Sequence, residues 1–282
     1  MPQPIVLSFI QAKQLLKARA AKAETALASP DLGISMVEVT IADSGAIFPG
    51  GECLSWDDAT TIAAEETRCF VLEHGRIKPI QIYSEETDRF YSLMPTEGAP
   101  TLLISGIPMH RIKGTDPYKD TLSKVRTIAP IRGRVLDTAT GLGYTAIEEA
   151  KTAEQVITVE FDPAALEIAR LNPWSRRLFD NPTIEQRIGD VFDVVQDFAD
   201  GSFSCILHDP PMFSLAGQLY SGEFYRQLYR VLKRGGRLFH YIGDPSNTSA
   251  ATVTRGAVRR LQEAGFTRIV RRPEAFGVVA YK

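Results

Sequence analysis

The second part of the chain alternates between short apolar runs and amphipathic stretches. The apolar runs predict strands at 134–137, 155–160, 183–188, 203–208 and 236–242, and helical spacing between them predicts helices at 143–152, 163–171, 191–198 and 220–233. This alternation indicates a parallel sheet with crossover helices. After a helix containing Ala257 and Leu261, strands at 267–272 and 276–281 are separated only by Pro273, Glu274 and Ala275, so the sheet should end in an antiparallel hairpin.

The first part of the chain has a different texture. Val37, Val39 and Ile41 alternate with polar residues, as in a half-buried strand, and an apolar stripe running from Ala12 to Leu27 predicts an opening helix. Further strand-like runs lie at 69–73, 79–84, 89–94 and 100–105, and a short helix is expected at 56–66. We therefore expect a small α+β domain at 1–112, mostly antiparallel, followed by an α/β domain at 113–282.

Composition narrows the class of protein. A formal net charge of -2 and a pI near 6.1 give no global field that attracts nucleic acid or anionic lipid. The arginines near the end of the chain could form a local basic face, although solvated surface arginines are the simpler interpretation; they are Arg255, Arg259, Arg260, Arg268, Arg271 and Arg272.

The three cysteines are far apart in sequence, which predicts neither a disulfide framework nor a metal site. No leader pattern is visible, and no run approaches the roughly 18 apolar residues of a membrane span. We expect a cytoplasmic enzyme with no metal and no membrane partner; a homo-oligomer remains open.

The stretch VLDTATGLGYTA at 135–146 carries the strongest chemical signal. An apolar run ends in Asp137, a turn containing Gly141 and Gly143 follows, and a helix begins at once. Glycines let the backbone approach a ligand, and the N–H groups of the helix start face it. The turn also matches the G-x-G-x-x-A pattern of dinucleotide-binding proteins. The acid that ends the first strand and the C-terminal hairpin argue against a nicotinamide dehydrogenase.

Three more acids each follow an apolar run: Glu160, Asp190 and Asp209. With the loop, they make residues 113–282 similar to class I S-adenosylmethionine-dependent methyltransferases, which have a Rossmann-like seven-stranded sheet. The resemblance implies S-adenosylmethionine as the cofactor. Its amino-acid part would lie against the loop residues Asp137, Ala139, Gly141 and Gly143, its ribose on Glu160, and its adenine on Asp190 and the backbone of Val191. Ala139 stands where the family often has glycine.

The run HDPPMFS at 208–214 resembles the (D/N)-P-P-(Y/F) motif of methyltransferases that act on amino nitrogens. In this resemblance Asp209, Pro210 and Pro211 are the catalytic residues, because a carboxylate and a rigid carbonyl can hold two N–H bonds of a poorly nucleophilic amine. Phe213 would stack on the acceptor one position later than the usual aromatic residue, and Tyr220 would line its pocket. A related motif variant uses a nucleophilic cysteine, but Cys205 lies inside a strand and is interpreted as core packing.

Phrases such as SGIPMHR (105–111), NPWS (172–175) and FHYIGDP (239–245) extend the resemblance over the whole chain. They are similar to a group of archaeal-type predicted methyltransferases described as related to spermine synthase. Methylation of an amino or amide nitrogen is the leading hypothesis. A nucleobase in RNA is the favoured acceptor, followed by a protein and then by a small molecule.

Two alternatives stay open. An aminopropyltransferase would use decarboxylated S-adenosylmethionine, but its usual GGGDG-like loop is replaced here by TATGLG. A non-catalytic cofactor-binding protein is the other. His110, His208 and His240 are interpreted as structural histidines, although one of them could act as a base.

Overall fold

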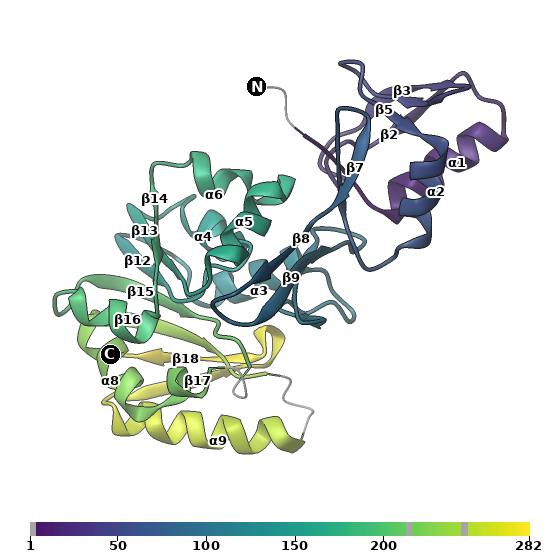
Figure 1. The fold of residues 1–282 in the computed structure, drawn as a ribbon. Helices are drawn as coiled ribbons and strands as arrows, with labels where there is room; N and C mark the ends of the chain where they lie inside the picture. Colours follow the sequence, from purple (N-terminus) through teal and green to yellow (C-terminus); the bar gives the residue numbers. More distant parts are fainter. Residues whose placement is uncertain (1–3, 213–215, 244–247) are drawn as a thin grey trace. The chain divides into compact units, whose positions relative to one another are not determined.

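The computed structural model describes residues 4–212, 216–243 and 248–282. The chain divides into two compact units (Figure 1). The first contains residues 1–118 and the segment 164–176, and the second contains 119–163 and 177–282.

The first unit is built from antiparallel sheets with strand orders β1-β6-β7, β2-β3-β4-β5 and β11-β10-β9-β8. Its strands are β1 (Ile5–Leu7), β2 (Thr25–Ala28), β3 (Val37–Ala42), β4 (Gly45–Ile47), β5 (Cys53–Ser55), β6 (Phe70–Glu73), β7 (Arg76–Pro79), β8 (Gln81–Ser84), β9 (Arg89–Met94), β10 (Thr101–Ile104) and β11 (Ile107–Pro108). Helices α1 (Phe9–Ala20) and α2 (Trp56–Ala64) pack together over an apolar core that includes Leu15, Phe48 and Ile62.

The opening helix is shorter than the apolar stripe predicts. Helix α1 ends at Ala20, and Leu27 lies in strand β2. The N–H of Ala23 donates to the carbonyl of Ala18, and Lys22 adopts a left-handed φ of 54°. This is a Schellman ending with lysine at the position that glycine usually holds, so the sequence carried no stop signal there.

The second unit contains the predicted seven-stranded sheet, with the order β14-β13-β12-β15-β16-β18-β17. Its strands are β12 (Arg134–Asp137), β13 (Gln155–Glu160), β14 (Ile184–Ile188), β15 (Phe203–His208), β16 (Leu232–Tyr241), β17 (Arg268–Arg272) and β18 (Gly277–Tyr281). Strands β12 to β16 pair in parallel, while β18 is antiparallel to both β16 and β17. The Rossmann-like sheet with a C-terminal antiparallel hairpin is therefore confirmed.

The remaining helices connect these strands. They are α3 (Pro117–Thr127), α4 (Tyr144–Glu149), α5 (Pro163–Leu171), α6 (Arg176–Asp180), α7 (Val191–Val194), α8 (Gly222–Val231) and α9 (Thr248–Glu263), with short 3₁₀ turns η1 (Pro173–Ser175), η2 (Val195–Asp197), η3 (Gly217–Tyr220) and η4 (Pro273–Ala275).

One face of the seven-stranded sheet carries the main core of the second unit. Apolar residues spaced three and four apart on α8, such as Phe224, Leu228 and Val231, are fully buried against it. Leu261 of α9 and Ile206 of β15 join the same core. Figure 1 shows α8 and α9 lying along the part of the sheet formed by β16 to β18. This packing fixes the strands whose ends carry the candidate site.

Candidate functional site at the carboxyl edge of the sheet

The candidate site lies where the parallel strands end. Strand β12 has β13 on one side and β15 on the other, so Asp137 pairs in register with Thr158 and with Leu207. After β12 the chain continues into β13 on one side of β12. After β14 it returns to β15 on the other side, so the direction of the strand order reverses between β12 and β15. A crevice forms at such a switch point, outside the carboxyl ends of the strands, and it is the usual ligand site of open α/β sheets.

The glycine turn after β12 is tied to the next strand. The N–H of Gly141 donates to Glu160 Oε2 at 2.8 Å, and the hydroxyls of Thr140 and Thr158 lie 2.7 Å apart. Gly141 and Gly143 have φ values of 51° and 74°. A Cβ on Gly143 would meet the Leu178 side chain at 2.6 Å, whereas a Cβ on Gly141 would meet nothing within 4 Å. The first glycine therefore borders open space, and the second permits close packing.

Glu160 is half-buried at the end of β13 and is held by the backbone. Besides the bond from Gly141, its Oε1 accepts the N–H of Asp162 at 3.2 Å. Burial raises the pKa of Glu160, and these N–H donors oppose the shift. Phe161 and Ile188 expose 49% and 58% of their surfaces beside it, and Ile188 is the register partner of Glu160. Sequence reasoning missed these two residues, because exposed apolar side chains become visible only in the structure.

Asp190 is the N-cap residue that precedes helix α7. Its Oδ1 accepts the N–H of Phe192 at 2.9 Å, so the side chain caps the helix. Val191, the first residue of the helix, is buried, and its N–H makes no hydrogen bond within the described part of the chain. The second carboxylate oxygen of Asp190 and the backbone N–H of Val191 are therefore both available to a ligand at the edge.

Asp137 lies deeper than the other acids. It is fully buried, and its oxygens accept the Thr145 hydroxyl at 2.7 Å and the N–H of Ala139 at 3.4 Å. Burial raises the pKa of Asp137 to about 7, and the charge of Asp209 adds to the shift. Glu149, also fully buried, has a raised pKa because of burial and the charge of Asp137. These contacts make Asp137 an organiser of the loop.

Asp209, at the end of β15, is held by a buried cation. Lys124 Nζ of α3 lies 2.6 Å from Asp209 Oδ2 and 2.8 Å from Asp120 Oδ2, with the lysine side chain only 3% exposed. The ammonium also lies over the ring of Tyr241, 4.7 Å from its centroid. Burial lowers the pKa of Lys124, but the two carboxylates outweigh it and leave the pKa above its ordinary value.

The environment of Asp209 follows from this pairing. Burial raises the pKa of Asp209, and the Lys124 ammonium opposes that shift. The Asp209 side chain keeps 19% of its surface exposed, so the group is both ion paired and accessible. Lys124 was missed from the sequence, because its distance of 85 positions from Asp209 leaves no local pattern.

Tyr220 supports the motif that follows Asp209. Its hydroxyl donates to the carbonyl of Pro211 at 3.0 Å, and its own carbonyl accepts Arg260 Nε at 2.8 Å. Tyr220 is 4% exposed, while Pro210 is buried and Pro211 partly so. Tyr220 thus fixes the second proline of the motif. Phe213 lies outside the described residues.

Two of the three histidines considered from the sequence lie inside the second unit. The rings of His208 and His240 are fully buried with centroids 4.5 Å apart. His208 Nε2 faces the carbonyl of Leu219 at 3.0 Å, so this nitrogen carries the proton, and Nδ1 accepts from Thr138. Burial lowers the pKa of His208 to about 3 and that of His240 in the same direction. Both rings are neutral packing groups.

The two remaining candidates from the sequence are His110 and Cys205. His110 belongs to the first unit, where its Nδ1 lies 3.0 Å from the Thr101 hydroxyl. Cys205 is 1% exposed within β15, and burial raises the pKa of its thiol, which disfavours the reactive thiolate.

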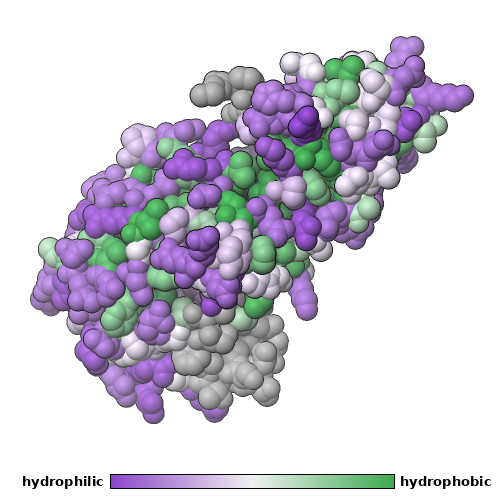
Figure 2. Space-filling view, in the orientation of Figure 1, coloured by the Kyte–Doolittle hydropathy of each residue, from purple (hydrophilic) through white to green (hydrophobic). Residues whose placement is uncertain are grey.

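Polar residues cover most of the surface seen in Figure 2. In the described ranges, no helix combines the length and apolarity needed to cross a membrane. The same residues contain no cluster of three or more His, Cys, Asp or Glu side chains that could hold a metal ion.

Comparison with known proteins first defines the class. Residues 135–236 match the family described as a methyltransferase domain. Together with the sheet order, this match identifies the Rossmann-like part of the second unit as a methyltransferase-like domain. The chain belongs to the same family as the uncharacterized protein MJ1233 of Methanocaldococcus jannaschii, with 44% identity over 237 residues, 83% of this chain and 80% of that protein.

Other relatives carry a different name. A polyamine aminopropyltransferase of Mycobacterium tuberculosis is 32% identical over 145 residues, which are 48% of this chain and only 28% of that protein. A crystal structure of a spermidine synthase with a transition state analogue superimposes with a TM-score of 0.58 and 25% identity, covering 71% of this chain and 72% of that one. The structural likeness supports the fold over 71% of the chain, and the names of these relatives leave the transferred group open.

Proposed function

We propose that this protein transfers a methyl group from S-adenosylmethionine to an amino nitrogen. The observation that carries the proposal is the arrangement around Asp209. A partly exposed carboxylate, anchored by the buried Lys124, stands at the end of the strand next to the glycine loop. This position supports a role for Asp209 in receiving an acceptor amine beside a donor on the loop.

The half of the edge that contains the glycine loop, Glu160 and Asp190, here called the donor half, fits an adenosyl ligand. The loop is open beside Gly141, and each oxygen of Glu160 keeps a lone pair for a ribose hydroxyl. The unused N–H of Val191 and the second oxygen of Asp190 match the acceptor and donor atoms of an adenine edge. The exposed faces of Phe161 and Ile188 would cover the base.

The chemistry divides between donor and protein. Bound S-adenosylmethionine supplies a methyl carbon on a sulfonium, whose carbon–sulfur bond breaks with the electron pair leaving on sulfur. Asp209 accepts an N–H of the incoming neutral amine and so points the nitrogen lone pair at that carbon. The new nitrogen–carbon bond leaves the nitrogen positive, and its extra proton passes to the accessible Asp209 carboxylate or to water. Lys124 holds the carboxylate in place during this step.

The relatives named aminopropyltransferases favour a second candidate, transfer of an aminopropyl group from decarboxylated S-adenosylmethionine. A polyamine acceptor is a polycation, which calls for several accessible carboxylates. Next to Asp209, however, Asp137 is fully buried and Asp120 is paired with Lys124. This charge distribution supports methyl transfer to a less basic amine.

Labelled donors separate the two reactions. The protein is incubated with S-adenosylmethionine tritiated in the methyl group, or with decarboxylated S-adenosylmethionine labelled in the aminopropyl chain, together with fractionated RNA, protein and small molecules from its source cell. Methyl label entering an amine in one fraction supports the proposal. Label entering only from the decarboxylated donor would establish aminopropyl transfer instead.

Asp209→Asn is the matched control for this experiment. It keeps the size of the side chain but removes the charge, and we expect turnover to fall by about 10²-fold or more with donor binding retained. Wild-type turnover in this variant would remove Asp209 from the mechanism.

A further inference from the structure

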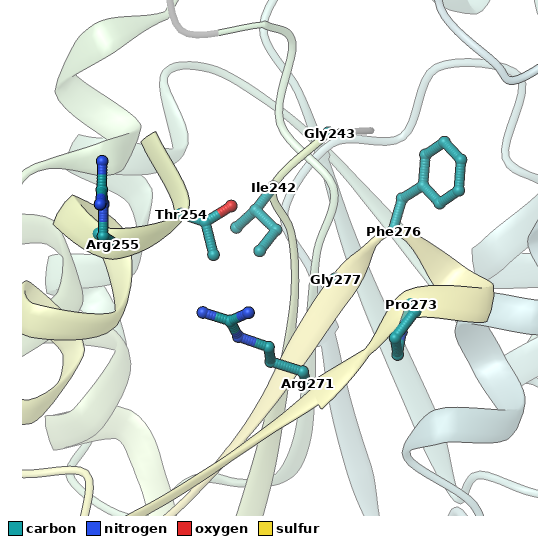
Figure 3. Close-up of a pocket in the computed structure, with 8 residues that line it drawn as sticks. All are labelled: Ile242, Gly243, Thr254, Arg255, Arg271, Pro273, Phe276 and Gly277. Carbon is teal, nitrogen blue, oxygen red and sulfur yellow. The ribbon is translucent and has the colours of Figure 1, made fainter. Parts of the chain in front are cut away.

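A separate pocket opens farther along the same edge of the sheet, with a volume of about 220 Å³ (Figure 3). It lies where β16 ends and β18 begins, beside α9 and β17. Its described lining residues include Ile242, Thr254, Arg255, Arg271 and Phe276. The donor residues Glu160 and Asp190 are not part of it.

The described lining combines positive charge with an apolar wall. The Arg271 guanidinium points into the pocket toward Thr254 and Ile242, as Figure 3 shows, and Arg255 lies at its border on α9. Arg271 forms no hydrogen bond or ion pair within the described part of the chain. The described lining contains no Asp or Glu. An anionic group attached to a small apolar body matches this lining.

The pocket is connected to Asp209 through adjacent strands. His208, which precedes Asp209, is the register partner of His240 in β16. Two residues later, the N–H of Ile242 donates to the carbonyl of Phe276 at 2.9 Å, which places the pocket wall one strand beyond the Asp209 strand. Neighbouring strands lie about 4.8 Å apart, so the wall of the pocket begins about one strand spacing from the strand that ends at Asp209.

We propose that this pocket binds the carboxylate or phosphate group of a small-molecule acceptor whose amine is presented to Asp209. The inference rests on the proposed function, because it assigns the acceptor to the edge that carries Asp209. The positive charge of Arg271 in the pocket repels a polycationic acceptor. The small concave volume and the net charge of -2 favour a compact anion over an RNA backbone.

Calorimetry with inorganic phosphate and with succinate tests the pocket directly. We expect weak binding of at least one of these anions to the wild type. Arg271→Gln should weaken it about fivefold or more, because the guanidinium that faces the pocket is lost. Arg259→Gln is the matched control, since Arg259 is an exposed residue of α9 that pairs with Glu263. Equal affinities in the wild type and Arg271→Gln, or no anion binding at all, would overturn the inference.

Two further probes distinguish the sources of such an anion. Spermidine should not compete with phosphate, and an RNA hexamer should bind no more tightly than phosphate. Competition by spermidine, or tight RNA binding that depends on Arg271, would also overturn the proposal. S-adenosylmethionine binding is measured in parallel. If Arg271→Gln loses anion affinity but retains donor affinity, the anion-binding role of the pocket is supported whichever group is transferred. If the wild type does not bind the donor, that result counts against the proposed function alone.

Discussion

The two halves of the sheet edge hold their carboxylates in different ways. On β13, Glu160 is held by backbone N–H groups of the glycine loop and of its own turn. On β15, Asp209 is held by one buried side chain, Lys124, which also pairs with Asp120. A carboxylate held by the backbone is positioned by the fold itself, whereas one held by a buried cation depends on a single residue. Each half should therefore respond differently to substitution.

Lys124→Met should cause the largest loss of stability. It leaves Asp120 and Asp209 without their buried counter-ion, and breaking such a pair costs about 3–5 kcal/mol of unfolding free energy. Urea denaturation measures this loss. In the folded fraction, turnover should fall by about tenfold or more, since Asp209 loses its anchor.

Arg126→Met provides the comparison for this prediction, because Arg126 is exposed on the same helix α3. Its unfolding free energy should change by less than about 0.5 kcal/mol. In the double variant Lys124→Met/Asp209→Asn, part of the lost stability should return because one unpaired charge is removed. An additive double variant would show that the pair is not coupled.

On the donor half, the two loop glycines should separate stability from binding. Gly143→Ala places a Cβ against Leu178 at 2.6 Å in a left-handed conformation, and should cost about 2–4 kcal/mol. Gly141→Ala faces open space and should cost only about 1–2 kcal/mol. Its new methyl group would nevertheless meet the donor, so affinity for S-adenosylmethionine should fall. Equal unfolding costs, or an unchanged donor affinity in Gly141→Ala, would contradict the assignment of the loop.

A further effect is a pH dependence of stability that arises from Asp137. Because its pKa is raised to about 7 in the folded protein, the folded state binds more protons than the unfolded state between about pH 4 and pH 7. This group therefore lowers stability as pH rises through that window. Asp137→Asn does not titrate, so its stability relative to the wild type should increase from about pH 4 to pH 7 and then level off. Parallel curves would show that Asp137 is not buried and protonated as described.

The sequence predicted much of the second unit, because strand–helix alternation and glycine turns are local patterns. The ends of β12, β13 and β15 and the C-terminal hairpin are confirmed. The predicted opening helix was too long, because α1 ends at Ala20 in a left-handed turn where Lys22 takes the place that glycine usually holds. Lys124 and the exposed Phe161 could not be found in advance, since burial and long-range pairing depend on the completed fold.

Calorimetric titration of S-adenosylmethionine into the wild type, Glu160→Gln and Asp209→Asn tests the division of the edge most directly. We expect the wild type to bind the donor and Asp209→Asn to retain wild-type affinity. Glu160→Gln should bind the donor about tenfold more weakly or worse, because a charged acceptor is lost. A loss of affinity in Asp209→Asn equal to that in Glu160→Gln, or no binding by the wild type, would contradict this division.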